Sequence, residues 1–125
     1  MNEKILSLAL GYYKSMSEKN IPELKQYLHP NVQVISPLAT VTGIQSVLEA
    51  SKGFVQIFKS LTIKSQFISN NQIMLVMDLD CPEPIGFFRS AVMMTFLDNL
   101  IIRNELFYDT RPLEKYKEKI FSREI

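Results

Sequence analysis

The hydrophobic period of the chain changes once, near residue 60, and this change constrains the fold more than any other feature. Before it, apolar side chains such as Ile5, Ala9, Tyr12 and Met16 recur at helical spacing. After it, four runs show the period of two that is typical of strands: LTIKSQFI (61–68), IMLVMDLD (73–80), FFRSAVMMTFL (87–97) and LIIRNELFYD (100–109). Helices followed by an antiparallel meander predict an α+β fold, with the helices covering one face of a curved sheet.

Local signals give the expected element boundaries. The first helix is predicted over residues 3 to 18, and the second from a cap at Asn20 to Pro30. VQVIS (32–36) reads as a short strand, and a third helix follows Gly43. Asp98 and Asn99 form a tight hairpin turn, and the stretch from Leu113 to Phe121 is predicted to be a short helix.

The composition indicates one ordinary globular domain with little net charge. Of 125 residues, 46% are hydrophobic and 22% are charged, and 14 basic residues offset 13 acidic ones to give a net charge of +1. Such a chain has no basic field for nucleic acid, so no nucleic-acid partner is expected. No run approaches the ~20 apolar residues that span a membrane, and no export signal is evident, so we expect no membrane partner and a cytoplasmic location. The single cysteine, Cys81, fits a reducing compartment.

Several strings, taken in order, resemble a known family. They are YYKSMSEKNIPELKQYLHPNVQVISP (12–37), TG (42–43) and LIIRNELFYDTRP (100–112). The chain resembles the nuclear transport factor 2-like superfamily, and within it the SnoaL-like group of polyketide cyclases and related small proteins. The resemblance implies a cone-shaped fold, with three N-terminal helices packed on a curved antiparallel or mixed sheet around a cavity. It implies one domain over residues 1–125, with a core of about 3–113 and a helical tail over 113–125.

The catalytic residues of two enzyme classes in this superfamily do not transfer to this chain. In the pattern of the ketosteroid isomerases, Tyr12 falls at the tyrosine position, but Ser36 stands at the base position and Val92 or Met93 at the second donor position. The steroid-isomerase mechanism therefore lacks its base.

In the pattern of the limonene-epoxide hydrolases, Asp78 matches the middle-strand aspartate, but Val76 replaces the arginine and Leu106 the second aspartate. Both alignments predict that Val76, Asp78 and Asp80 point into the cone.

From this resemblance and from strand alternation we predict a pocket with Asp78 as the candidate catalytic base. The predicted lining consists of Tyr12, Ser36, Val76, Asp80, Ser90, Val92, Met94, Asn104, Leu106 and Tyr108. Burial among apolar side chains would raise the pKa of Asp78 and make it a usable base. The alternatives are an ordinary ion pair between Asp78 and Arg89 across the hairpin, or solvation at the strand end.

Other polar residues also have two interpretations. Tyr12 and Tyr108 either donate to a ligand or give their hydroxyls to the backbone while their rings pack in the core. Asn104 shares the phase of Tyr108 and is a candidate polar anchor. His29 is expected at a helix C-terminus, where its charge is favourable, rather than as a base. Asp109 and Arg111 are expected to pair at the exit of the last strand.

No metal site and no cofactor are predicted, because one histidine, one cysteine and scattered glycines form no ligand motif. Three functions remain open. The first is a pocket protein that binds a small, largely apolar molecule. The second is an acid–base enzyme with Asp78 as base, and the third is a dimeric protein-interaction module. The resemblance also implies a homodimer through the outer sheet face, where Phe87, Met93 and Phe107 are expected to be exposed.

Overall fold

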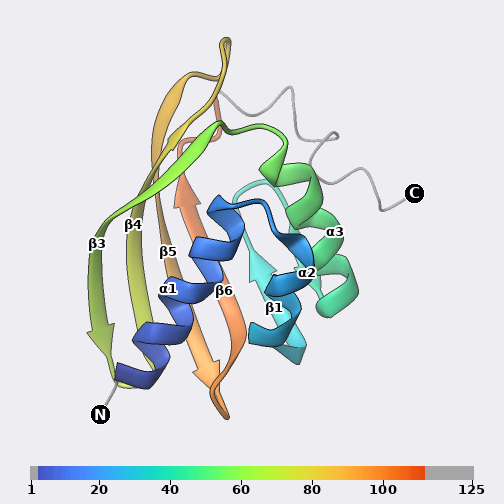
Figure 1. Ribbon diagram of the computed structural model, residues 1–125, viewed down its shortest axis with the longest axis vertical. Helices are drawn as coiled ribbons and strands as arrows, with labels where there is room; N and C mark the ends of the chain where they lie inside the picture. Colours follow the sequence, from blue (N-terminus) through green and yellow to red (C-terminus); the bar gives the residue numbers. More distant parts are fainter. Residues whose placement is uncertain (1–2, 112–125) are drawn as a thin grey trace.

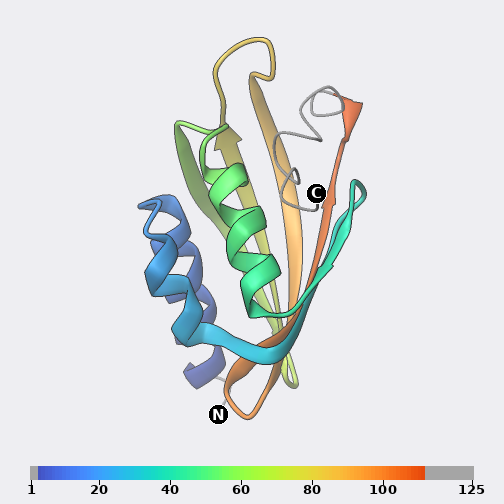
Figure 2. The same ribbon diagram turned by 90° about the vertical axis from the view of Figure 1, so that its right-hand side faces the viewer.

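The computed structural model describes residues 3–111. They form one six-stranded sheet that is covered on one face by helices (Figures 1 and 2). The helices are α1 (Glu3–Ser17), α2 (Ile21–Leu24), a 3₁₀ turn (Lys25–Tyr27) and α3 (Ile44–Val55). The strands are β1 (Leu28–Ile35), β2 (Thr40–Thr42), β3 (Ser60–Ser69), β4 (Gln72–Asp80), β5 (Phe87–Leu97) and β6 (Leu100–Tyr108). The predicted C-terminal helix lies outside the described residues.

The strands are ordered β2-β1-β6-β5-β4-β3, so β6, the last strand in the described part of the chain, lies in the middle of the sheet. β1 and β6 pair in parallel, and the other neighbours are antiparallel. The sheet is therefore mixed, and the predicted cone-shaped α+β fold is confirmed. Register shifts beside Ile63 in β3 and Phe96 in β5 are irregularities of the kind that bend strands.

The helices cover the concave face because their apolar sides match the inward side chains of the sheet. Ile5, Ala9 and Tyr12 of α1 and Val47 of α3 are buried against that face. The expected hairpin turn is also confirmed, since Asp98 and Asn99 have φ angles of 55° and 62°, which asparagine and aspartate tolerate better than most residues.

The second helix is shorter than predicted. It ends at Leu24 and tightens into the 3₁₀ turn, and β1 begins at Leu28, two residues before Pro30. Asn20 precedes the helix but makes no side-chain cap. His29 consequently lies in a strand and not at a helix C-terminus, so the predicted dipole interaction is wrong. Instead, Nδ1 of His29 accepts a hydrogen bond from the backbone N–H of Asn31.

Candidate functional site

A mostly apolar cavity lies between the helices and the concave face of the sheet. The centre of a water molecule can occupy about 90 Å³ of it. Since one water needs roughly 10–15 Å³ on this measure, the space is large enough for a small organic molecule. Its lining residues come from α1, α3 and the strands β1, β2, β4, β5 and β6: Tyr12, Tyr13, Met16, Val34, Ser36, Val41, Val47, Ala50, Ser51, Phe54, Met77, Leu79, Phe88, Ser90, Asn104, Leu106 and Tyr108.

Six of the residues predicted for the pocket lie in this lining: Tyr12, Ser36, Ser90, Asn104, Leu106 and Tyr108. The inward phase predicted for β6 is therefore correct, because Asn104, Leu106 and Tyr108 alternate along the strand on the cavity side. In β5 the predicted phase is also correct, with Ser90 directly opposite Tyr108 in the register.

The predicted phase of β4 is wrong. Met77 and Leu79 line the cavity, and alternation places Val76, Asp78 and Asp80 on the outer face. The physical reason is burial: Met77 and Leu79 lose nothing when they enter an apolar cone, whereas two carboxylates there would lose their hydration. The alignments with family patterns that turned these carboxylates inward therefore do not hold for this strand.

Asp78 forms the ion pair with Arg89 that was the alternative to a catalytic role. The Arg89 Nε–Asp78 Oδ1 distance is 2.6 Å and the Nη2–Oδ2 distance is 3.0 Å, which is a bidentate arrangement. The hydrogen bonds from Arg89 lower the pKa of Asp78, and the charges of Arg89 and Lys64 act in the same direction. A carboxylate outside the cavity with a lowered pKa is not a base for a molecule inside it.

Val92 and Met94 face inward, as predicted, but they do not line the cavity. Both are fully buried, and their register partners across β4 are Leu75 and Ile73. They belong to the packed core. Alternation identifies the face of a side chain but not how far along the cone it lies.

Buried tyrosines form the wall that α1 contributes. Burial raises the pKa of Tyr12 to about 12, a shift that its hydrogen bond with Ser51 partly opposes. Burial likewise raises the pKa of Tyr13 well above its ordinary value. The hydroxyl of Ser51 donates to the carbonyl of Val47 at 2.8 Å. With its pKa raised by burial, Tyr12 is protonated near neutral pH.

Ser36, at the position of the isomerase base, is occupied by its own turn. Its hydroxyl donates to the carbonyl of Ala39 at 3.0 Å and accepts from the N–H of Ala39 at 3.2 Å. Ser36 thus closes the link between β1 and β2 and leaves its carbon atoms at the cavity.

Asn104 is 2% exposed, less than any serine of the lining. Its Oδ1 accepts no hydrogen bond from any group in residues 3–111. The prediction of Asn104 as a polar anchor is consistent with this position.

Sequence reasoning missed the contribution of α3. Val47, Ala50, Ser51 and Phe54 all line the cavity, and their i, i+3, i+4, i+7 spacing marks one face of the helix. That spacing was readable in the sequence, but the predicted pocket was built from strands and from the first helix only.

The remaining polar candidates lie away from the cavity. Arg111 holds both carboxylate oxygens of Asp109, with a shortest contact of 2.6 Å, and these hydrogen bonds lower the pKa of Asp109 to about 2. This is the pair expected at the exit of β6. Within residues 3–111, no three His, Cys, Asp or Glu side chains gather as a metal site would require. No helix in the same part of the chain has the length and apolarity to span a membrane.

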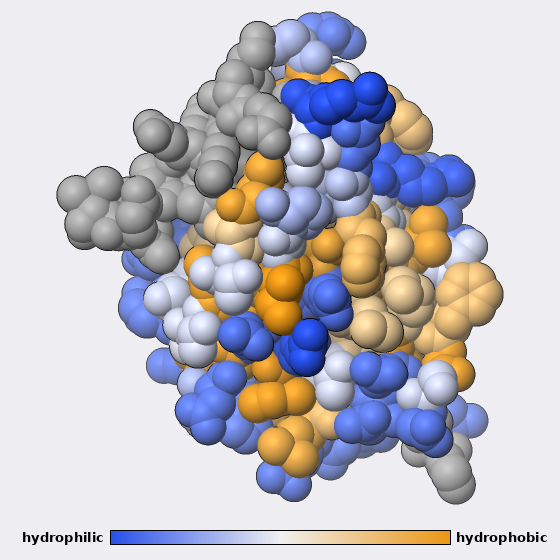
Figure 3. All heavy atoms as spheres, turned by 180° about the vertical axis from the view of Figure 1, so that it is seen from behind, coloured by the Kyte–Doolittle hydropathy of each residue, from blue (hydrophilic) through white to orange (hydrophobic). Residues whose placement is uncertain are grey.

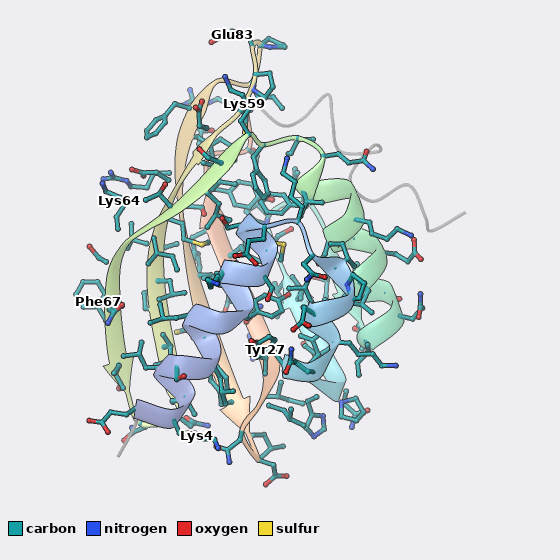
Figure 4. All side chains as sticks on the ribbon, viewed as in Figure 1. Lys4, Tyr27, Lys59, Lys64, Phe67 and Glu83 are labelled. Atoms are coloured by element: carbon teal, nitrogen blue, oxygen red, sulfur yellow. The ribbon has the colours of Figure 1, made fainter. Side chains whose placement is uncertain are left out.

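The outer face of the sheet carries a second feature, an apolar patch over its middle (Figure 3). Two cross-strand rows form it, Phe67–Met74–Met93 and Val76–Ala91–Phe107, and we call these six residues the outer apolar patch. Phe67 and Phe107 are 60% and 46% exposed. Phe67 lies on β3, at the free edge of the sheet (Figure 4). Phe87, also expected to be exposed, is exposed at the start of β5.

Comparison with known proteins supports the fold. No protein-family model matches the sequence, and no curated protein matches it. Among solved structures, a steroid delta-isomerase from Pseudomonas aeruginosa has a TM-score of 0.80 at 17% identity, with 96% of this chain and 90% of that chain covered. An NTF2-like protein of unknown function from Cytophaga hutchinsonii has a TM-score of 0.77 at 17% identity, covering 87% and 93%. A putative polyketide cyclase from Sinorhizobium meliloti has a TM-score of 0.73 at 14% identity, covering 82% and 93%. The chain has the fold that these proteins share.

Proposed function

We propose that this protein, which has the fold of the nuclear transport factor 2-like superfamily, binds a small, largely apolar molecule in the cavity between its helices and its sheet. The observation that carries the proposal is the cavity itself. Native cores are close-packed and seldom leave spaces larger than a few water molecules. Here large side chains such as Phe54, Met77 and Tyr108 surround the space without filling it.

The chemistry of the lining favours binding over proton transfer. The titratable side chains in the described lining are tyrosines, and burial raises the pKa values of Tyr12 and Tyr13. The acid–base alternative depended on Asp78, which lies on the other face of the sheet and is paired with Arg89. The solved steroid isomerase and putative cyclase are consistent with a pocket in this fold, but at 14–17% identity they assign no reaction to this chain.

The proposal is tested by thermal unfolding in the presence of toluene, a probe small enough for the cavity. A ligand that binds only the folded protein raises the unfolding temperature with increasing concentration. Ala50 lines the cavity, so Ala50→Leu places extra carbon atoms inside it and should abolish the shift. Ala91 lies on the outer face, and Ala91→Leu is the matched control that should retain the shift. Equal shifts for both variants would place toluene elsewhere and refute the proposal.

We further propose that the outer apolar patch pairs two copies of the chain. Its centre is apolar, and ion pairs flank it: Asp78–Arg89 at one end and Arg103–Glu105 at the other. An apolar core with a polar rim is the usual anatomy of an interface. Each end of the outer apolar patch carries both a positive and a negative side chain. A second copy related by a two-fold axis therefore presents an opposite charge to each of them, whichever ends of the two patches meet.

Analytical ultracentrifugation tests this interface. Phe107→Lys places a charge in the outer apolar patch and should convert a dimer into a monomer. Leu97 has a similar exposure, 49% against 46%, but lies beside the hairpin turn, so Leu97→Lys should leave the dimer intact. A native protein that sediments as a monomer at tens of micromolar would refute the proposed interface.

A further inference from the structure

Asn104 occupies a position in the cavity where a polar side chain needs a partner. It lies on β6, with Met94 of β5 and Val34 of β1 as its register neighbours. The side chain is 2% exposed and belongs to the cavity lining. Met94 and Val34 are apolar, so an amide oxygen between them loses the hydrogen bonds that it makes to water in the unfolded chain.

No group in the described part of the chain donates a hydrogen bond to Oδ1 of Asn104. Most buried polar atoms in native proteins have a partner, so each exception requires an explanation. Asn104 lines the cavity, so a rotation of its amide can present the oxygen to a molecule there, and that molecule then supplies the missing partner.

The neighbouring hydroxyl groups direct their protons elsewhere. Ser36 donates to Ala39, and Ser51 donates to Val47. Tyr12 is engaged with Ser51.

Ser90 is opposite Tyr108, which is four residues further along β6 than Asn104. At the usual rise of a strand this is roughly 13 Å, beyond hydrogen-bonding reach. The oxygen of Asn104 is therefore left without a donor among residues 3–111.

We infer that Asn104 determines specificity, and that the ligand class is a small apolar compound carrying a hydroxyl or N–H group that donates to this amide. This inference rests on the proposed function and narrows its ligand class. A hydroxyl fits best, because it both donates and accepts and so suits either rotation of the amide. An apolar body is set by the walls of Val34, Leu106 and Met77, and the single polar group by Asn104.

The test compares phenol with toluene, two rings of similar size that differ in a hydroxyl and a methyl group. The dissociation constants of both compounds are measured by NMR titration for the native protein and for Asn104→Leu. We expect the ratio of the toluene constant to the phenol constant to fall about tenfold in Asn104→Leu, which is the typical net effect of one hydrogen bond. Comparing ratios removes the general preference of an apolar site for toluene.

Asn71→Leu is the matched control. It makes the same exchange of side chains in the β3–β4 turn, where Asn71 donates to the carbonyl of Phe96, so it should leave the ratio unchanged. A measurement on the native protein gives a second reading that does not depend on a variant. Phenol should shift the side-chain amide signals of Asn104 more than toluene does.

The possible failures are distinguishable. If both compounds bind and the ratio is the same in Asn104→Leu, the amide keeps a water molecule or a protein partner in the complex. The inference is then overturned, while the proposed function stands. If neither compound binds the native protein, the proposed function and this inference are both refuted.

Discussion

Replacing Asn104 by leucine should make the ligand-free protein more stable, although it removes the residue that we assign to ligand recognition. A buried acceptor without a partner costs about 1–3 kcal/mol of folding free energy. Asn104→Leu removes this cost at a site that is 2% exposed, and the adjoining cavity gives room for the two methyl groups that replace the amide oxygen and nitrogen. We expect the free energy of unfolding to rise by about 1–3 kcal/mol, and the melting temperature by roughly 3–6 °C for each kcal/mol.

Urea denaturation followed by circular dichroism measures this change. A two-state analysis should show a higher midpoint with an unchanged slope, which indicates altered stability and not an altered unfolded state. Asn71→Leu provides the opposite case, because Nδ2 of Asn71 donates to the carbonyl of Phe96 at 3.0 Å. Loss of that bond should lower the free energy of unfolding by about 0.5–1.5 kcal/mol.

One outcome would refute the reasoning. If Asn104→Leu lowers stability as Asn71→Leu does, the amide of Asn104 has a partner in the folded, ligand-free protein. Its role would then be structural. A rise in stability with weaker binding of phenol would instead show a side chain kept for recognition at the expense of stability, a conflict common at functional sites.

Three further predictions concern a tyrosine of the cavity wall, an ion pair on the sheet and a close contact beside helix α1. The pKa of Tyr12 is raised to about 12, so above a pH of about 10 this tyrosine ionises in the unfolded chain before it does in the folded protein, and the free energy of unfolding should fall as the pH rises. The urea midpoints of Tyr12→Phe should fall less steeply over the same pH range. Asp78 has a lowered pKa, so its ion pair with Arg89 stabilises the fold above the unfolded pKa of about 4, and this contribution is lost as the pH falls. NMR titration of the Asp78 carboxyl should give a pKa below that value. Asp78→Asn should make the free energy of unfolding less sensitive to acid. Gly11→Ala places a Cβ 2.6 Å from Oη of Tyr27, which lies beside α1 (Figure 4). This overlap should lower the free energy of unfolding by about 1–3 kcal/mol, although alanine has the better helix propensity. In urea denaturation, adding Tyr27→Phe should recover part of that loss.

The fold was predictable because all three helices precede residue 60 and the four long strands of the meander begin at or after it. The predicted run 87–97 is the observed β5, and the predicted helix over residues 3 to 18 ends one residue later than α1. The end of the second helix was not predictable from the same signals. Leu24, Tyr27 and Leu28 keep a helical spacing, but Leu28 is buried as the first residue of a strand, where its parallel pairing with Ile101 depends on a distant segment.

The candidate site was predictable only where one face of a strand is clearly polar. In β6, Arg103 and Glu105 mark the outer face, so Asn104 falls inside. In β4, the outer Met74 and Val76 are as apolar as the inner Leu75 and Met77, because they belong to the outer apolar patch. Alternation alone therefore did not decide the phase. The position of Arg89 directly opposite Asp78 in the hairpin was the available signal that the carboxylate faces outward.

The central place of β6 in the sheet has a consequence for how the protein is made. Asn104, Leu106 and Tyr108 are among the last described residues to leave the ribosome, yet β6 separates β1 from β5. Until residues 100–108 emerge, both of those strands present unpaired edges, and one wall of the cavity does not exist. Pairing β1 with β6 also joins segments about seventy residues apart, the kind of distant contact that slows folding. We therefore expect ligand binding to arise only after residues 100–108 have been synthesised, with the nascent chain dependent until then on protection of its open sheet edges.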